Sequence, residues 1–291
     1  MSFLATTEEI EEIGALHSNP AFLPDHHIDQ SLRQIGTVVA IITVVQLVFL
    51  QIFRSRLSKG SDQSSAWKSS YQFTNLLVNL FLGVLGIYHY YFTLPRPALT
   101  VSEKVEGWES LSIFSDIQIG YQLWALPVGY FFVGETSGMM FHHVQVVVVG
   151  CLSAFFWNGF RYVTPFFYGL IEISSVPLSV MNYFKTRPEL IKERPTMYTV
   201  VRLIFSVVFL TVRVVMWVPN MFDWLKTCGI LCYTCDNASC YAGLGLSMLA
   251  GFGLTVLQMV WASKIVEGLL KAAAGGGKKK KSAEDNSEKK D

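Results

Sequence analysis

The chain has 291 residues, of which 51% are hydrophobic and only 15% are charged, whereas an average soluble domain carries about 25% charged residues. The formal net charge is +1, so nothing in the composition indicates a nucleic-acid partner. The apolar residues gather in runs of about twenty, the length that crosses the hydrocarbon core of a bilayer. Inside lipid each run must be helical, because its backbone polar groups need internal partners. The composition therefore argues against an ordinary soluble domain and predicts an all-α, polytopic transmembrane helical bundle.

The N-terminal segment, residues 1–34, precedes the first apolar run. It contains Glu8, Glu9, Glu11 and Glu12, and it lacks the basic start and short apolar stretch of a secretory signal peptide. We expect this segment to be luminal or extracellular, and the first apolar run to act as the membrane-targeting signal.

About seven segments of the transmembrane region, residues 35–270, are apolar and long enough to be spans. In chain order they are 35–53, 73–94, 111–133, 139–158, 162–184, 198–218 and 244–266. The fifth contains Glu172, Pro165 and Pro177. A bundle of six spans would follow if this fifth segment only dips into the membrane.

The basic residues indicate the orientation. They gather in the first loop, in the fifth loop and in the C-terminal tail, residues 271–291, which contains Lys278–Lys281. With seven spans these three segments fall on one side, which the positive-inside rule assigns to the cytosol. The polar composition of the tail predicts disorder. Its lysines either form a stop-transfer anchor that fixes the orientation, which is the preferred interpretation, or attract anionic lipid headgroups by about 1 kcal/mol each.

The sixth loop of this scheme carries four of the five cysteines and an N-glycosylation sequon at Asn237. On the luminal side, four cysteines in one loop indicate two disulfides. A zinc site and free thiols are the alternatives, although the cysteine spacing fits no standard zinc pattern. The four residues are Cys228, Cys232, Cys235 and Cys240.

Ionisable side chains inside spans are costly, so they indicate function by default. His142 and His143 open the fourth span, Glu172 lies in the fifth, Arg213 in the sixth and Asp116 near the start of the third. Adjacent histidines suit proton transfer near neutral pH. The alternative is that they make hydrogen bonds between helices. Glu172 and Arg213 could pair across the bundle, either to fix helix register or to contact a ligand.

The order of these polar groups resembles the TLC-domain family of membrane proteins, which includes the ceramide synthases and related lipid-homeostasis proteins. The His142-His143 pair opens a Val-rich span, and Glu172-Ile173-Ser174-Ser175 with Pro177 is similar to the family's Glu-x-Ser-x-Pro segment. The penultimate and closing helices of the family are matched by Phe209, Arg213, Gln258, Trp261, Lys264 and Ile265. The resemblance covers residues 35–270.

The chain also departs from the family pattern. Pro177 is one residue later than the pattern expects. Ceramide synthases carry a pair of aspartates downstream of the histidines, whereas this chain has none and places Ser174-Ser175 in that neighbourhood. The resemblance is therefore closer to the non-synthase members, which are implicated in membrane lipid composition, trafficking or sensing.

The resemblance implies a protein of lipid homeostasis that binds, senses or handles an acyl lipid or sphingolipid in its bundle, without a cofactor or a metal. The implied lipid-binding residues are His142, His143, Glu172, Arg213, Asp116 and Trp261. The alternative is an acyl-CoA-dependent N-acyltransferase of the ceramide synthase type, in which His142 or His143 would be the catalytic base. A seven-helix transporter or receptor is a third hypothesis, but no internal repeat is evident.

The expected location is the endoplasmic reticulum or another endomembrane, with the plasma membrane as the alternative and the C-terminus in the cytosol. The expected partner is a membrane lipid.

Overall fold

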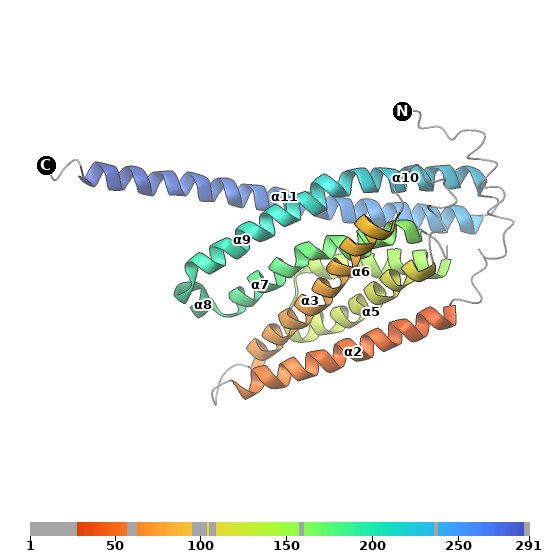
Figure 1. Cartoon of the computed structure of the whole chain (residues 1–291), viewed down its shortest axis with the longest axis horizontal. Coiled ribbons are helices and arrows are strands. Elements are labelled where there is room, and N and C mark those ends of the chain that lie inside the picture. Colours follow the sequence, from red (N-terminus) through yellow and green to blue (C-terminus); the bar gives the residue numbers. More distant parts are fainter. Residues whose placement is uncertain are drawn as a thin grey trace.

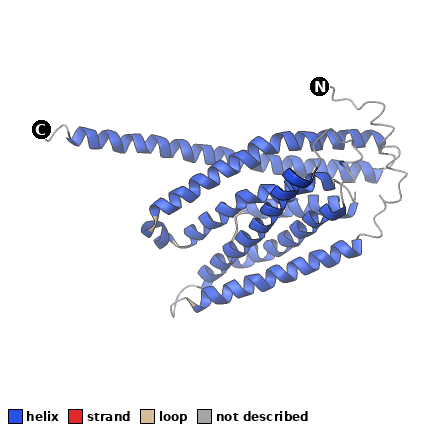
Figure 2. Cartoon of the chain, in the orientation of Figure 1, coloured by secondary structure: helices blue, strands red, loops and turns tan. Residues whose placement is uncertain are grey.

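The computed structural model describes residues 28–56, 63–94, 104, 109–156, 160–235 and 238–287, and these residues form helices joined by short connections (Figure 2). The first half contains α2 (Ile28–Ser55), α3 (Gln63–Tyr88) with η3 (His89–Thr93), η4 (Glu109–Leu111), α5 (Ser112–Val128) with η5 (Gly129–Val133), and α6 (Ser137–Cys151) with η6 (Leu152–Phe156). The second half contains η7 (Arg161–Val163), η8 (Pro165–Gly169), η9 (Leu170–Ser174), α7 (Ser175–Thr186), α8 (Pro188–Glu193), α9 (Pro195–Leu210), η10 (Thr211–Met216), α10 (Trp217–Thr234) and α11 (Ala238–Ser287).

The prediction of an all-α membrane bundle is confirmed, but the number of spans is not settled at seven. Five helices of the described residues are long and apolar enough to cross a membrane: Ile28–Ser55, Gln63–Thr93, Ser137–Phe155, Pro195–Cys232 and Ala238–Ala272. The third and fifth predicted spans are also helical and lie within the bundle, as α5 with η5 and as η7 to α7. They fall outside this set of five. The third contains Asp116, Gln118 and Gln122, and the fifth is broken into 3-10, π and α turns.

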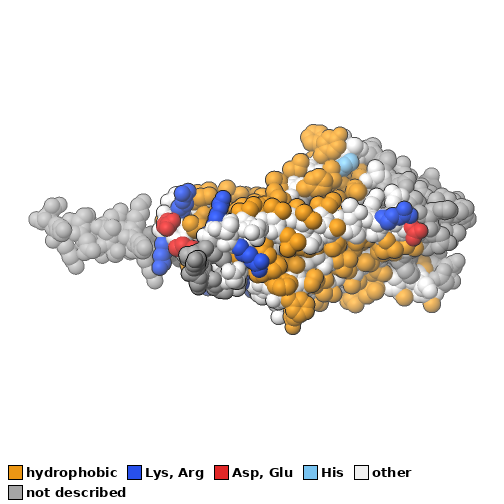
Figure 3. All heavy atoms as spheres, turned by 90° about the horizontal axis from the view of Figure 1, so that it is seen from below, with side chains coloured by type: hydrophobic (Ala, Val, Ile, Leu, Met, Phe, Trp, Pro, Cys, Tyr) orange, Lys and Arg blue, Asp and Glu red, His pale blue; other side chains and the backbone are white. Residues whose placement is uncertain are grey.

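The helices pack as an up-and-down bundle in which successive long segments run in opposite directions (Figure 1). α5 packs between α2 and α6, α3 packs against α2 and α7, and α11 packs against α6 and α10. The face of the bundle seen in Figure 3 is largely apolar, with charged side chains gathered toward one end and a smaller group near the other. A band of this kind suits a bundle that is surrounded by lipid.

The two ends of the bundle differ in chemistry. At one end, α2 finishes with Arg54 and α7 finishes with Lys185, and the guanidinium of Arg187 lies 5.6 Å from the ring centres of both Phe53 and Tyr183. We call this the basic end. At the other end, a disulfide between Cys235 and Cys240 joins α10 to α11, and we call this the disulfide end.

The cysteine segment differs from its prediction in two ways. α10 continues to Thr234, so Cys228 and Cys232 lie in a helix and not in a loop. Both are free thiols, so the prediction of two disulfides is wrong for this pair, and the structure forms one disulfide, Cys235–Cys240. The segment is helical because its buried residues recur every three or four positions, so they form one face that packs α10 against its neighbours. These residues are Met221, Trp224, Cys228, Leu231 and Cys235. Asn237, the predicted glycosylation site, lies outside the described residues.

The C-terminal helix α11 is the longest of the described elements. Its backbone is helical to Ser287, through the segment that contains Lys278–Lys281. The side chains that the structure describes in α11 end at Ala272. The disorder that the sequence predicts for the tail therefore stays a prediction.

Glycines allow α3 to touch the irregular segment η8–η9. A Cβ atom added to Gly86 would lie 2.6 Å from the Cα of Gly169 and nearer still to the backbone nitrogen of Leu170. A Cβ added to Gly83 would lie 3.0 Å from the backbone nitrogen of Ile173. Small residues at these two positions let the backbones approach, as is common between membrane helices. This contact holds the segment that carries Glu172.

We predict that Gly86→Ala destabilises the bundle by about 1–3 kcal/mol, because the new methyl group would collide with backbone atoms that cannot rotate away. Gly36→Ala is the matched control, since a Cβ at Gly36 meets no atom within 4 Å. Unfolding free energies of both variants, measured in one detergent, check this. Equal stability of the two variants would show that α3 and η8–η9 are less tightly packed than described.

Candidate functional site

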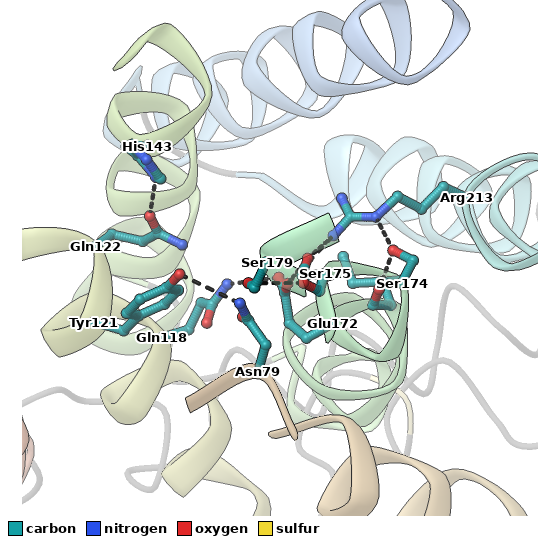
Figure 4. Close-up of polar contacts among 11 residues, drawn as sticks. Asn79, Gln118, Tyr121, Gln122, His143, Glu172, Ser174, Ser175, Ser179 and Arg213 are labelled. Carbon is teal, nitrogen blue, oxygen red and sulfur yellow. Dashed lines mark hydrogen bonds and ion pairs between the residues drawn. The ribbon is translucent and has the colours of Figure 1, made fainter. Parts of the chain in front are cut away.

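A buried ion pair lies at the centre of the bundle. The Arg213 NH2 nitrogen is 3.2 Å from a Glu172 carboxylate oxygen, and both side chains are 5% exposed. Ser174 and Ser175 accept further hydrogen bonds from Arg213, at 2.7 Å to its Nε and 3.1 Å to its NH2 group. The other Glu172 oxygen accepts from Gln118 at 3.1 Å (Figure 4). Each charge therefore has an opposite partner and additional hydrogen bonds, which a buried ion pair needs.

Glu172 and Arg213 both lie in helical turns that are not regular α-helix. Glu172 lies in the 3-10 segment η9, and Arg213 lies in the π-helical segment η10. π-turns are rare and are frequent at functional sites, because the extra residue turns side chains away from their α-helical direction. The sequence prediction that these residues could pair across the bundle is confirmed.

The two histidines face different surroundings. α6 begins after Thr136, whose side chain accepts from the Met139 N–H at 3.4 Å, and His142 and His143 follow within the next two turns. The His143 ring is hydrogen-bonded through Nδ1 to the Gln122 side chain of α5. The His142 ring packs edge-on against Trp261 of α11, with 5.5 Å between ring centres, and its Nδ1 has no hydrogen-bond partner.

Asp116 lies apart from these groups. Its carboxylate accepts a 3.3 Å hydrogen bond from Ser31 of α2, on the side of α5 away from the ion pair. The structure therefore brings together His142, Glu172, Arg213 and Trp261, places His143 beside them, and leaves Asp116 as a contact between α2 and α5.

An open pocket of about 430 Å³ lies between the start of α6, α7, α9 and α11. Its volume falls in the range of small-molecule sites, about 300–1,000 Å³. Arg213, Ser174, Ser175 and His142 lie on its wall, and Asn182, which accepts from Lys185, extends it toward the basic end. The remaining wall is mostly apolar and includes Leu178, Phe205, Phe209, Trp261 and Ile265, with Glu135 and Lys264 as charged members.

A second, narrower cavity of about 60 Å³ runs from His142 toward the disulfide end, and we call it the apolar slot. It follows α11 from Ser247 to Gln258, which at 1.5 Å per residue is about 16 Å. Its walls are mainly aromatic and aliphatic, with Phe160, Phe167, Trp217, Trp224 and Leu254 among them. His142 lines both the open pocket and the apolar slot, so its ring forms a wall that the two spaces share.

Sequence reasoning missed several amide side chains of the site. Gln118 and Gln122 lie four residues apart in α5, on one face, and bond Glu172 and His143 respectively. Gln258, which the sequence analysis used only as a family marker, is fully buried in the wall of the slot. A glutamine pair at helical spacing within an apolar span was the available signal for α5. Among the described residues, no group of three or more His, Cys, Asp or Glu could hold a metal ion.

Comparison with known proteins gives one match. The family model of the TLC domain matches residues 65–267, more than half of the chain. The matched region begins within α3, so α2 lies outside it. No curated protein and no solved structure matches the chain significantly.

We predict that Glu172→Gln destabilises the bundle by about 3–5 kcal/mol, because it leaves the charge of Arg213 buried without its partner. The double variant Glu172→Gln/Arg213→Met removes both charges and should recover most of this loss. Unfolding free energies in one detergent test both changes.

Glu267→Gln is the matched control, since it breaks an exposed ion pair with Lys271 on α11. Exposed pairs contribute about 0–1 kcal/mol. If Glu172→Gln were as mild as this control, the pair would not carry the buried charge that we assign to it.

Proposed function

Because the chain belongs to the TLC-domain family of membrane proteins, we propose that it binds an amphiphilic lipid inside its helical bundle and acts in lipid homeostasis. The acyl chain of the lipid would lie in the apolar slot and its headgroup in the open pocket. The observation that carries this proposal is the meeting of the two spaces at His142.

The chemistry of the two spaces fits the two parts of a lipid. The slot follows about 16 Å of α11 by helix geometry and is lined mainly by apolar side chains, which suit a hydrocarbon chain. Its cavity of about 60 Å³ would have to widen to admit the chain. The open pocket offers Lys264, Glu135 and the serine hydroxyls beside Arg213, which suit a polar headgroup. Apolar walls with a few convergent polar groups are the usual composition of a ligand site.

The ion pair has a defined role in this proposal. Glu172 and Arg213 neutralise one another, so the centre of the bundle carries no net charge from this pair. A lipid could then pass close to them without bringing a counter-ion. The headgroup would face the basic end, which the positive-inside rule assigns to the cytosol, in the endoplasmic reticulum or another endomembrane.

We predict that Leu254→Trp lowers lipid binding about tenfold or more, a change of about 1.4 kcal/mol or more, because the larger ring would fill the slot that Leu254 lines. Leu249→Trp is the matched control, since Leu249 lies on the same helix and is 67% exposed to the lipid side. Native mass spectrometry of the chain purified in mild detergent would measure the lipid retained by each variant.

Equal lipid retention by the two variants would contradict binding in the slot. A wild-type chain that carries no lipid and gains none from added acyl lipids would contradict the function itself.

A second candidate function, acyl transfer from acyl-CoA to a lipid amine, is favoured by one observation: the His142 Nδ1 atom has no partner and its ring borders both spaces. In this reaction a histidine would take the proton of the attacking amine. The nitrogen would then bond the thioester carbonyl carbon, the carbon–sulfur bond would break, and coenzyme A would leave as a thiol.

We predict for this candidate that purified chain transfers labelled acyl groups from acyl-CoA to a sphingoid amine, and that His142→Ala lowers the rate by about 10²–10⁴-fold, the usual contribution of general base catalysis. His89→Ala is the matched control, because His89 lies in η3 and hydrogen-bonds Thr93, away from both spaces. Lipid binding without any transfer would exclude this candidate and leave the binding function in place.

A further inference from the structure

Buried polar atoms without partners gather at the His142 end of the apolar slot, where it meets the open pocket. Both the Nε2 and Oε1 atoms of Gln258 lack a hydrogen-bond partner, although its side chain is 0% exposed. The Oε1 atom of Gln118 also lacks a partner, and Gln118 is 1% exposed. Both side chains line the slot, beside His142. Buried amide groups without partners cost free energy, so a group that satisfies them would be stabilised here.

The unpartnered atoms of Gln118 and Gln258 include more hydrogen-bond acceptors than donor groups. Gln118 must turn its NH2 group toward Glu172, because a carboxylate only accepts hydrogen bonds. Its carbonyl oxygen is therefore the atom left without a partner. Gln258 contributes a second carbonyl oxygen and one NH2 group. The His142 end of the slot thus offers two acceptors and one donor group, and a ligand must bring a donor to satisfy either oxygen.

Resting on the proposed lipid-binding function, we propose that Gln258 and Gln118 select lipids whose chain carries a hydroxyl or amide group, which donates as well as accepts a hydrogen bond. An ester or ether offers acceptors only, so it would leave both glutamine oxygens without partners. A free carboxylate has no donor when ionised, and it would place a negative charge near Glu172. The two glutamines therefore set specificity by the donor count of the ligand.

A ligand without a donor leaves the glutamine oxygens unpaired, and this free-energy cost is what separates the two kinds of ligand. Sites built to hydrogen-bond a ligand reject an analogue that lacks the matching group, because the buried polar groups of the site are then unpaired. The walls around the two glutamines are mainly apolar, so they offer few donors of their own. The slot would thus distinguish one linkage from another.

The test compares two probes that differ in one donor. N-methylpalmitamide and methyl palmitate have the same chain, and only the amide carries an N–H group. We expect wild-type chain in nanodiscs to bind the amide about tenfold more tightly than the ester. Gln258→Met, which keeps the side-chain length and removes both polar atoms, should reduce this ratio to about threefold or less. Affinities are measured by native mass spectrometry titration.

Gln46→Met is the matched control, since Gln46 is also a buried glutamine but bonds Ser70 and Thr74 between α2 and α3. It should leave the amide-to-ester ratio unchanged. The wild-type ratio tests the inference even if Gln258→Met fails to fold.

The possible results separate the inference from the function that it rests on. Equal binding of amide and ester by the wild-type chain would overturn the selectivity and leave the lipid site intact. An amide preference that survives in Gln258→Met would overturn the role of Gln258. If neither probe nor any acyl lipid binds, the proposed function itself fails.

Discussion

The structure depends on one buried ion pair. A charge inside a membrane bundle is tolerated only with a partner, and Glu172 and Arg213 supply one another at 3.2 Å. To meet, their segments abandon regular α-helix, as η9 on one side and η10 on the other. Gln118 then ties α5 to the same carboxylate. Three segments far apart in the chain are thereby held in register at the depth where the open pocket and the apolar slot meet.

The interior is more polar than packing alone requires. Amide and hydroxyl side chains of α3, α5 and α7 line a further small cavity beside the histidines, and several of their atoms lack partners. An apolar core would be more stable, because unsatisfied buried groups cost free energy. Proteins usually depart from such consistency at functional sites. The polarity of this bundle therefore supports a ligand site in its interior rather than a purely structural core.

Part of this arrangement could be predicted from the sequence. A charge inside an apolar span has few possible partners, so the sequence predicted that Glu172 and Arg213 could pair. The adjacent histidines likewise predicted a candidate site in the interior of the bundle. Neutral amides are ambiguous, because they also join helices, so the sequence did not show that Gln118 and Gln258 line the slot. Asp116 was misleading, since its partner Ser31 lies in the first turn of α2 and was taken as part of the N-terminal segment. Asp223 and Lys226 interrupt the apolar run, which hid the continuation of α10.

The helix formed by α9, η10 and α10 has a consequence for the surrounding bilayer. It runs without a break from Pro195 to Thr234, which at 1.5 Å per residue is about 60 Å. Its exposed apolar side chains extend from Met197 to Phe222, about 38 Å along the axis, whereas a hydrocarbon core is about 30 Å thick. Such a mismatch is relieved by tilting the helix or by thickening the bilayer locally. The tilt of this helix, and with it the position of Arg213, is therefore coupled to the thickness of the membrane in which the protein resides.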